Sequence, residues 1–497
     1  MASCKVNIKW GKEKFSDIEC CVDESPDVFK AQIFALTGVQ PERQKVMLKG
    51  ATLKESWTGF KVKDGVTFLV MGSAEALPEA PTQKTLFVED MTDEQLATAF
   101  ELSAGLKNLG NTCYLNSTVQ CLRSIPELRE SLKKYDGHVN QAMASVQPAE
   151  SITAAMRDLF DAMEKATDGI PPIFLLHLLH IAFPQFAEKN EHGVFQQQDA
   201  NECWVQLVRL LQQQLTVSVA GENQQAEGAS ASQKGFIDQY LGGRFDCSLK
   251  CVEAPEEEES KSTEQFMQLS CFISQDVKYL HTGLKNRLTE NIEKFSPSLE
   301  RNAQYIKESR ISRLPAYLPI QMVRFYYKEK EAINAKILKD VKFPLILDVF
   351  DLCTKELQEK LIPIRAKFKE MEDRKVEELQ KAKQTEKKQP APAVEQSIKL
   401  LPYDFSDDIG SNNSGYYELQ AVLTHQGRSS SSGHYVGWVK KKGEEWIKFD
   451  DDSVSPVASE DVLKLSGGGD WHCAYVLLYG PRRLDEPAQD EEPMSEK

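Results

Sequence analysis

Apolar and polar side chains alternate along the first part of the chain, as they do in β-strands buried on one face. Between two such stretches, apolar residues recur at the spacing of an amphipathic helix, with Ser25 or Asp27 as the candidate cap. The predicted elements are strands at 5–10, 15–22, 46–50 and 65–71 and a helix at 27–36. The pattern therefore predicts a small domain over residues 1–72, followed by an Ala-, Pro- and Glu-rich linker at 73–102.

Residues 103–481 carry helical periodicity first and strand-like runs afterwards, which is typical of an α+β domain. The predicted elements are helices at 113–123, 152–165, 174–182 and 199–215 and strands at 317–326, 416–423, 435–439, 446–449 and 474–478. Stretches near 221–234, 253–263 and 368–395 have the composition of insertions, and the last of these predicts a solvated helix that ends before Pro390. Residues 482–497 predict a mobile acidic tail.

Composition narrows the class of protein. The chain has 497 residues, 41% hydrophobic and 27% charged, which predicts a globular protein of more than one domain. The N-terminus lacks the apolar core of a signal peptide, and the longest apolar run, at 171–181, is too short to span a bilayer. We therefore expect no transmembrane segment.

Charge and cysteine content further restrict the possible partners and cellular location of the protein. The formal net charge of −15 disfavours nucleic acid or anionic lipid as the main partner, although acidity by itself mostly indicates solubility. The 11 cysteines are odd in number and have no framework spacing. An odd number without framework spacing favours reduced thiols over disulfides. We therefore expect the protein in the cytoplasm, and the nucleus is the second compartment that keeps thiols reduced.

One cysteine lies at the start of a predicted helix, in the stretch GLKNLGNTCYLNS over residues 105–117. With Asn111 as the expected N-cap, Cys113 falls in the first turn, where unpaired N–H groups and the helix dipole favour a thiolate. Asn108, five residues earlier, could donate its amide to an oxyanion. The alternative is a buried structural thiol, which is the prediction for Cys121.

A thiolate nucleophile needs a base, and His434 is the candidate, at the start of a strand directly after a glycine and four serines. A three-residue hairpin loop ending at Gly443 would set His434 opposite Asp450, where a carboxylate can orient the imidazole. A one-residue slip in register would present Asp451 instead, so Asp451 is the second choice. An isolated histidine would otherwise be a core or surface residue.

Three separated stretches resemble the sequence boxes of the ubiquitin-specific proteases. Residues 105–117 resemble the cysteine box, 197–202 (QQDANE) resemble the internal QQDAHE element, and 417–436 with 446–451 resemble the histidine box. The resemblance covers about residues 103–480 and implies a papain-like thumb-palm-fingers fold. It implies Cys113 as nucleophile, His434 as general base and acid, Asp450 as orienting acid and Asn108 as oxyanion donor. The substrate channel that it implies involves Gln198, Asp199, Ser431, Ser432, Gly433 and Tyr435.

Residues 1–72 resemble ubiquitin in the order of their elements and at 41–46 and 48–53, which implies a β-grasp fold. The segment runs on through Gly72 to Ser73 without paired glycines, so it resembles a fused ubiquitin-like module. Strand alternation turns Leu69 outward beside Met47, where the two could form an apolar docking patch. In proteasome-associated members of the family such a module docks on the proteasome. The alternative is that Met47 and Leu69 are exposed to solvent without any function, as single apolar side chains often are.

The resemblance implies a cysteine-type deubiquitinase that cleaves the bond after the C-terminal glycine of ubiquitin on ubiquitinated proteins, without a cofactor. The serine-rich loop at 426–433 predicts gating of the channel, unless it is merely flexible. Many members bind zinc through paired Cys-x-x-Cys motifs, but only Cys247 and Cys251 remain here and their spacing differs, so we expect no metal. The alternatives are a non-catalytic ubiquitin-binding scaffold at the proteasome or, more remotely, a papain-like protease of another specificity.

Overall fold

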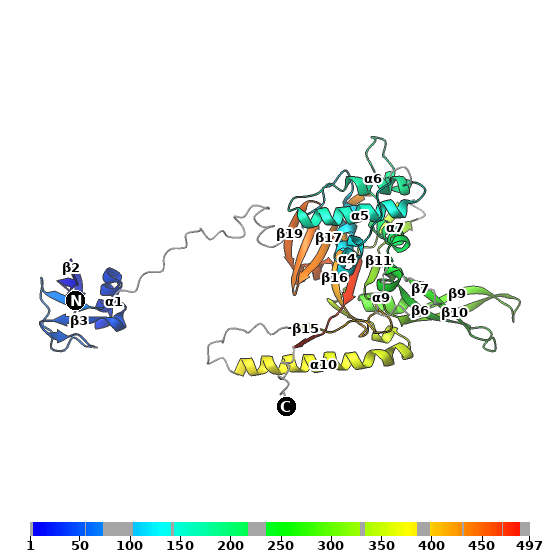
Figure 1. The fold of residues 1–497 in the computed structure, drawn as a ribbon. Helices are drawn as coiled ribbons and strands as arrows, with labels where there is room; N and C mark the ends of the chain where they lie inside the picture. Colours follow the sequence, from blue (N-terminus) through cyan, green and yellow to red (C-terminus); the bar gives the residue numbers. More distant parts are fainter. Residues whose placement is uncertain are drawn as a thin grey trace, which may run out of the picture. The chain divides into compact units, whose positions relative to one another are not determined.

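The computed structural model describes residues 3–54, 56–72, 103–140, 144–216, 235–328, 333–384, 398–429, 432–469 and 471–487. The chain divides into two compact units, Met1–Asp90 and Met91–Lys497, whose elements are labelled in Figure 1. The division falls within the predicted linker, whose residues 73–102 lie outside the described part of the chain. Each unit is described by itself.

The smaller unit is a five-stranded sheet in the order β2-β1-β5-β3-β4, with α1 packed on one face. Its elements are β1 (Ser3–Trp10), β2 (Glu13–Cys21), α1 (Pro26–Thr37), β3 (Lys45–Leu48), β4 (Ala51–Thr52) and β5 (Thr67–Met71). β1 and β5 pair in parallel at the centre, which fits a β-grasp-like domain. Ser25 caps α1 as expected, because its side chain accepts a hydrogen bond from the Asp27 N–H.

The larger unit begins with helices, as predicted. They are α3 (Cys113–Arg123), α4 (Pro126–Lys133), α5 (Pro148–Lys165), α6 (Ile173–Ala182), α7 (Ala200–Gln214) and α8 (Phe236–Tyr240). Among the described residues, no helix is both long enough and apolar enough to cross a membrane. The mixture of helices and largely antiparallel sheet confirms an α+β fold.

An eight-stranded sheet forms the middle of this unit, in the order β19-β18-β17-β16-β20-β11-β8, with β14 also paired to β16. The strands are β8 (Leu269–Phe272), β11 (Leu318–Val323), β14 (Ile346–Asp348), β16 (Tyr416–Ser429), β17 (Ser432–Lys442), β18 (Glu445–Asp450), β19 (Ser453–Ala458) and β20 (Cys473–Pro481). Both faces are covered: Val476 and Leu478 of β20 join the core beneath the helices, and Leu477 and Tyr479 join a second core.

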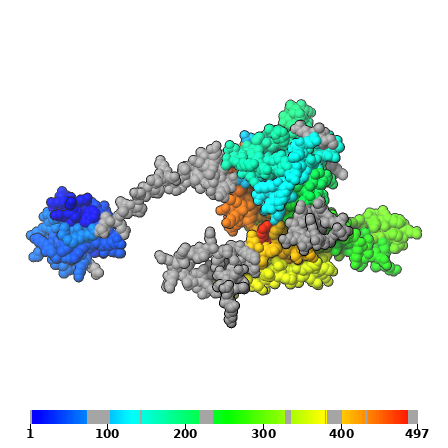
Figure 2. All heavy atoms as spheres, in the orientation of Figure 1, coloured from blue at the N-terminus to red at the C-terminus, as the bar shows by residue number. Residues whose placement is uncertain are grey.

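A separate four-stranded sheet, in the order β7-β6-β10-β9, extends away from the helices in Figure 1 and forms the green lobe in Figure 2. Its strands are β6 (Gly243–Cys251), β7 (Ser260–Phe266), β9 (Thr289–Ser296) and β10 (Arg301–Arg313). The remaining elements are α9 (Leu280–Arg287), β12 (Phe325–Lys328), β13 (Ile333–Lys336), α10 (Lys355–Gln384), β15 (Ile398–Leu400), α11 (Ser459–Leu463) and β21 (Asp485–Pro487).

Two of the stretches predicted to lack regular structure differ from that prediction. Residues 260–263 belong to β7, because they pair with β6. Residues 485–487 of the acidic tail pair with β15 instead of standing free. The stretch from 368 does form the predicted helix, since α10 continues through it as far as Gln384 and so ends before Pro390. Residues 221–234 and 488–497 lie outside the described residues. Backbone pairing along an edge can thus order polar sequence that composition alone assigns to loops.

α3 links the two halves of the larger unit. All of its residues are buried, and it packs across β17. At Gly437 of β17, an added Cβ would lie 3.4 Å from the carbonyl oxygen of Ser117, so glycine lets the helix approach the sheet closely. This packing brings the start of α3 near the start of β17.

Candidate active site

The turn before α3 differs from the sequence prediction in one residue. Asn111 is not the N-cap, because its φ of 55° is left-handed and the capping position is held by Thr112. Asn108 closes the turn instead, since its Oδ1 accepts hydrogen bonds from the N–H groups of Gly110 at 2.9 Å and Thr112 at 3.3 Å. Cys113 is still the first residue of the helix, as predicted, and it is 3% exposed.

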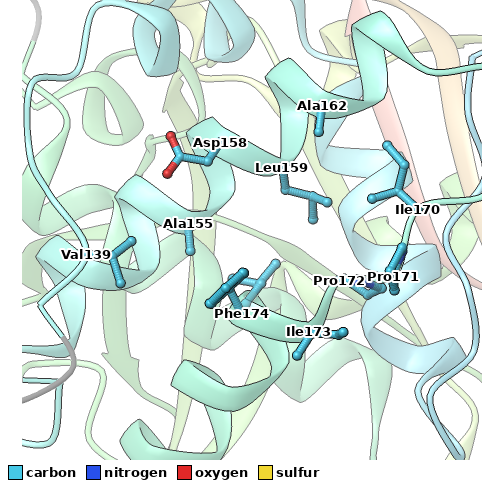
Figure 3. A pocket seen from close by; sticks show the side chains of 11 residues that line it. Val139, Ala155, Asp158, Leu159, Ala162, Ile170, Pro171, Pro172, Ile173 and Phe174 are labelled. Carbon is cyan, nitrogen blue, oxygen red and sulfur yellow. The ribbon is translucent and has the colours of Figure 1, made fainter.

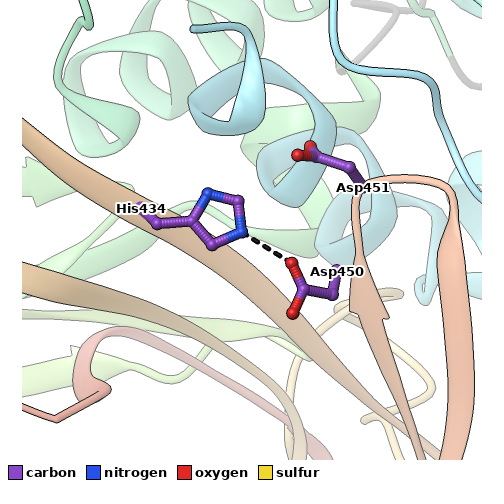
Figure 4. Close-up of side chains that lie close together, drawn as sticks. All are labelled: His434, Asp450 and Asp451. Carbon is purple, nitrogen blue, oxygen red and sulfur yellow. Dashed lines mark hydrogen bonds and ion pairs between the residues drawn. The ribbon is translucent and has the colours of Figure 1, made fainter.

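The structure brings Cys113, His434 and Asp450 together. His434 Nε2 lies 2.6 Å from Asp450 Oδ1 (Figure 4), which leaves Nδ1 as the ring nitrogen that can face Cys113. Hydrogen bonds to Asp450 and to Cys113 raise the pKa of His434 to about 10. The imidazole is therefore protonated at neutral pH, and a protonated imidazole stabilises negative charge on the neighbouring sulfur.

The hairpin register differs from the predicted one by two residues. Gly443 does hold a left-handed conformation, with a φ of 57°, but Gly437 pairs with Phe449 and Trp438 pairs with Lys448. His434 and Asp450 are therefore diagonal neighbours and not directly opposed. A shift of two residues keeps every side chain on the same face of the sheet, so the two groups still meet.

Lys448 holds the other oxygen of Asp450. Its Nζ lies 2.8 Å from Asp450 Oδ2, and it sits two residues earlier on the same face of β18. The hydrogen bond from His434, followed by that from Lys448, keeps the pKa of Asp450 well below its usual range. Both carboxylate oxygens are thus engaged, and the group stays ionised and fixed in orientation.

Asp451 points to a different pair of side chains. Its Oδ2 accepts a hydrogen bond from Asn108 Nδ2 at 2.9 Å and its Oδ1 accepts one from Asn116 Nδ2 at 2.8 Å. Asp451 has a left-handed backbone, with a φ of 55°, and the hydrogen bond drawn in Figure 4 joins His434 to Asp450. One hydrogen of the Asn108 amide is committed to Asp451, which leaves the second for a substrate oxygen.

His434, Asp450 and Asp451 are also a group whose ligand atoms lie within 4.8 Å of one another. A metal ion there would compete with Lys448, Asn108 and Asn116, which already bond the carboxylate oxygens. Two predicted non-ligands, Cys247 and Cys251, lie four residues apart on β6, or roughly 13 Å along a strand, and so do not share one ion. The donor set therefore suits acid–base chemistry better than metal binding.

The residues predicted to line a substrate channel fall into three groups. Asp199 caps α7 through Oδ1 and accepts a hydrogen bond from the Tyr475 hydroxyl at 2.6 Å, with Gln198 half-buried beside it. Ser432 and Gly433 are exposed at the start of β17, and Ser431 lies outside the described residues. Tyr435 is only 1% exposed, so it does not line an open surface here.

Sequence reasoning missed the aromatic cluster that covers Tyr435. The Phe325 ring of β12 lies 5.3 Å from the His425 ring and 5.2 Å from the Tyr475 ring. Burial is the largest cause that lowers the pKa of His425, to about 3. Within the described part of the chain, neither ring nitrogen of His425 nor the Tyr435 hydroxyl makes a hydrogen bond of normal geometry. Nothing in the local sequence indicates that β12 reaches this cluster.

In the smaller unit, Met47 and Leu69 are directly paired across β3 and β5. Leu69 is turned outward, as predicted: Leu69 and Met71 are 36% and 49% exposed, while Phe68 and Val70 are buried in the core. Met47, Leu69 and Met71 therefore share the outer face of the sheet, with Lys45 opposite Met71 at its edge.

Comparison with known proteins adds to this geometry. Residues 104–479 match the profile of the family described as ubiquitin carboxyl-terminal hydrolase. The chain is 42% identical over 489 residues to Ubiquitin carboxyl-terminal hydrolase 6 of Arabidopsis thaliana, covering 96% of this chain and 98% of that protein. It is 39% identical over 491 residues to Ubiquitin carboxyl-terminal hydrolase 14 of Caenorhabditis elegans, covering 97% and 94%. The chain belongs to the ubiquitin carboxyl-terminal hydrolase family.

Membership of the ubiquitin carboxyl-terminal hydrolase family makes the protein a thiol-dependent ubiquitin hydrolase. A third relative, Ubiquitin carboxyl-terminal hydrolase 6 of Schizosaccharomyces pombe, is 36% identical over 495 residues, covering 95% of this chain and 98% of that protein. The similarity covers 95–97% of this chain in these three relatives, so it extends across the smaller unit as well as the larger one.

Proposed function

We propose that Cys113 hydrolyses the bond after the C-terminal glycine of ubiquitin on ubiquitinated proteins. The observation that carries the proposal is the series of hydrogen bonds that joins Cys113 to His434 and His434 to Asp450. Cys113 lies at the start of a buried helix. The thiolate attacks the carbonyl carbon, and His434 gives its proton to the departing amine. Water then attacks the thioester as His434 takes its proton, and Asn108 donates to the oxyanion in both steps.

We propose the thumb-palm-fingers arrangement for the larger unit. The helices α3 to α8 correspond to the thumb, the eight-stranded sheet to the palm, and the projecting sheet β7-β6-β10-β9 to the fingers. The support for this correspondence is that Cys113 comes from a helix and His434 and Asp450 come from the sheet, as a cleft between thumb and palm requires. The tail of ubiquitin would then pass between Asp199 and the start of β17.

We propose that the channel is gated by the serine-rich loop at 426–433 together with β12. The supporting observation is that the Phe325 ring packs against His425, which directly precedes this loop, and against Tyr475. Moving Phe325 aside would open a path past these rings for an extended peptide. Opening is therefore coupled to substrate binding or to a partner that moves the loop.

Replacing Phe325 with alanine is expected to raise kcat/KM for a ubiquitin–fluorophore substrate by about 10-fold, because two aromatic contacts of roughly 0.5–1.5 kcal/mol each would no longer favour the closed state. Steady-state kinetics of the isolated protein measures the change. The matched control is Tyr326→Ala, which removes a neighbouring ring that is 47% exposed. An unchanged rate in Phe325→Ala would reject gating by β12.

We propose that the apolar face of Met47, Leu69 and Met71 docks the smaller unit on the proteasome. Replacing Leu69 with serine is expected to weaken binding to purified proteasomes by about 10-fold or more, as for a central interface residue, and to leave hydrolysis of free ubiquitin–fluorophore unchanged. The matched control is Leu36→Ser on α1, since Leu36 is 37% exposed and Leu69 is 36% exposed. Equal loss of binding in both variants would place the docking surface elsewhere.

The test of the proposed function is reaction with ubiquitin that carries a C-terminal electrophile. A covalent adduct is expected at Cys113, identified by mass spectrometry after proteolysis. Tight binding without an adduct, even with proteasomes present, would instead favour the non-catalytic scaffold. We propose that the protein acts in the cytoplasm and the nucleus. All 11 cysteines are free thiols, and a reducing compartment keeps thiols in that state.

A further inference from the structure

Asn116 is a buried polar side chain of α3 to which the proposed mechanism gives no role. It follows Cys113 by three residues and is 2% exposed. Its Nδ2 donates to Asp451 Oδ1 at 2.8 Å and also lies 3.1 Å from the carbonyl oxygen of Leu106 and 3.3 Å from that of Lys107. All of these partners are acceptors, so the NH₂ group of Asn116 must face them. The carboxylate of Asp451 makes the shortest of the contacts.

The oxygen of the same amide is not used. Within the described part of the chain, Asn116 Oδ1 is buried and makes no hydrogen bond. Burying a polar atom without a partner costs free energy, and an aliphatic side chain of similar size would avoid that cost. The amide at position 116 is therefore explained by what its N–H groups hold and not by packing.

The backbone around these acceptors is itself held in place. The N–H of Leu106 donates to the carbonyl oxygen of Asp451 at 2.9 Å, and the N–H of Lys107 donates to that of Ile170 at 2.8 Å. Ile170 is one of the residues that line an apolar pocket of about 430 Å³ between α5 and α6 (Figure 3). The main chain of Asp451 is thus fixed against residues 105–107, and only its side chain remains to be oriented.

Asp451 connects Asn116 to Asn108. Its Oδ2 accepts a hydrogen bond from Asn108 Nδ2 at 2.9 Å, so each carboxylate oxygen holds one asparagine amide. A carboxylate oxygen accepts and does not donate, so the NH₂ group of Asn108 must face Asp451. Asn108 Oδ1 accepts from the N–H groups of Gly110 and Thr112 on its other side. The Asp451 carboxylate and the turn before α3 together set the orientation of the Asn108 amide.

The side chain of Asp451 has a competing partner in His434. Ligand atoms of His434, Asp450 and Asp451 all lie within 4.8 Å of one another, and Figure 4 shows the three side chains. A protonated imidazole attracts any carboxylate at such a distance. The hydrogen bond from Asn116 holds Asp451 Oδ1, so that this carboxylate stays bonded to Asn108 and leaves His434 to Asp450.

We propose that Asn116 is a positioning residue for the hydrolase reaction: it fixes Asp451, and Asp451 in turn fixes the Asn108 amide that donates to the oxyanion. The inference rests on the proposed function, in which the second hydrogen of Asn108 Nδ2 stabilises the oxyanion. A donor that is already oriented is effective because it need not reorganise as the charge develops. Asn116 acts on the reaction only through Asp451.

The first test is steady-state kinetics of Asn116→Ala with a ubiquitin–fluorophore substrate. We expect kcat to fall about 10-fold with little change in KM, which is a part of the roughly 10²- to 10³-fold that one oxyanion donor contributes. The alkaline limb of kcat/KM should not move, because the hydrogen bond between His434 and Asp450 is retained. Asn116→Ser is the second variant and should behave in the same way, since a serine hydroxyl can bond to the preceding turn of its own helix.

The matched control is Gln120→Ala on the same helix. Gln120 is 3% exposed, and its Nε2 also donates to the chain before α3, at 3.0 Å from the carbonyl oxygen of Ala104. Its loss removes a buried amide and a hydrogen bond of the same kind without removing the donor to Asp451. Gln120→Ala should therefore keep kcat near that of the wild type.

The second test separates positioning from general damage to the site. In an Asn108→Ala background, Asn116→Ala should lower kcat by less than about 2-fold, because the amide that it positions is already absent. Alkylation of Cys113 by iodoacetamide, followed by mass spectrometry, should proceed at the wild-type rate in Asn116→Ala. Displacement of iodide by the thiolate forms no oxyanion, so this rate reports on the nucleophile alone.

Three results would overturn the proposal. An equal fall in kcat with and without Asn108 would show that Asn116 does not act through that residue. An equal fall in Gln120→Ala would reduce the effect to packing of α3. A shift of the alkaline limb in Asn116→Ala would mean that Asn116 acts on His434. Failure of the proposed function is distinguishable from all three, because the wild type would then not hydrolyse the substrate at all.

Discussion

Replacing Cys113 with alanine is expected to reduce the rate of ubiquitin–fluorophore hydrolysis by about 10⁴-fold or more, because the variant has no atom that can form the thioester. Binding of ubiquitin should persist, since Cys113 is buried and its truncation removes one sulfur from the start of α3. Pre-steady-state kinetics with excess enzyme gives the rate, and calorimetry gives the affinity. Cys113→Ser should also lose adduct formation, because a hydroxyl is far less nucleophilic than a thiolate in this setting.

The control for Cys113 is Cys121→Ala on the same helix. Cys121 is 1% exposed, and burial raises the pKa of its thiol to about 12, so it cannot act as a thiolate at neutral pH. Its replacement should cost stability and not chemistry, and the activity per folded molecule should remain near that of the wild type. If Cys121→Ala abolished adduct formation while Cys113→Ala retained it, the assignment of the nucleophile would be wrong.

Replacing Asp450 with asparagine is expected to lower kcat by about 10²- to 10⁴-fold with little change in KM. The amide is nearly the same size but cannot stabilise the protonated imidazole. The hydrogen bond to Asp450 is the largest cause of the raised pKa of His434, so that pKa should fall from about 10 toward its ordinary value. His434 must stay protonated beside the thiolate, and the alkaline limb of kcat/KM should therefore move to lower pH.

Asp452→Asn is the matched control for the acid, because Asp452 is exposed two residues further along the chain. It should leave both kcat and the pH profile unchanged. Asp451→Asn provides the sharper comparison. Its carboxylate accepts hydrogen bonds from Asn108 and Asn116, so its loss should lower kcat without moving the alkaline limb. If Asp451→Asn moved that limb and Asp450→Asn did not, Asp451 would be the acid.

The periodicity of apolar residues along single strands and helices predicted more of this structure than the expected register between paired strands did. α3 begins and ends where the apolar spacing places it, at Cys113 and Arg123. The partnership of His434 with Asp450 was predicted from a register that is two residues from the observed one. It survives because the face of a strand repeats every two residues, so an even error moves a side chain along the sheet without turning it over.

The features of the site that were not predicted depend on backbone conformations and long-range contacts, which a local sequence pattern does not contain. Asparagine is a common N-cap residue, but Asn111 has a left-handed φ and therefore does not cap the helix. The positive φ at Asp451 likewise decides which neighbours its carboxylate reaches. Lys448 could have been found from strand alternation with Asp450, whereas the approach of Phe325 to His425 joins residues 100 positions apart in sequence.

The place of β20 has a consequence for how the protein is made. This strand ends at Pro481, yet it lies between β16 and β11, and all nine of its residues are buried. On the ribosome, β11 and β16 emerge with unpaired edges and must wait for β20 before the sheet can close. Cys113 is synthesised more than 300 residues before His434. The nascent chain is therefore without hydrolase activity until synthesis is almost complete, and a premature stop before β20 would yield an aggregation-prone product.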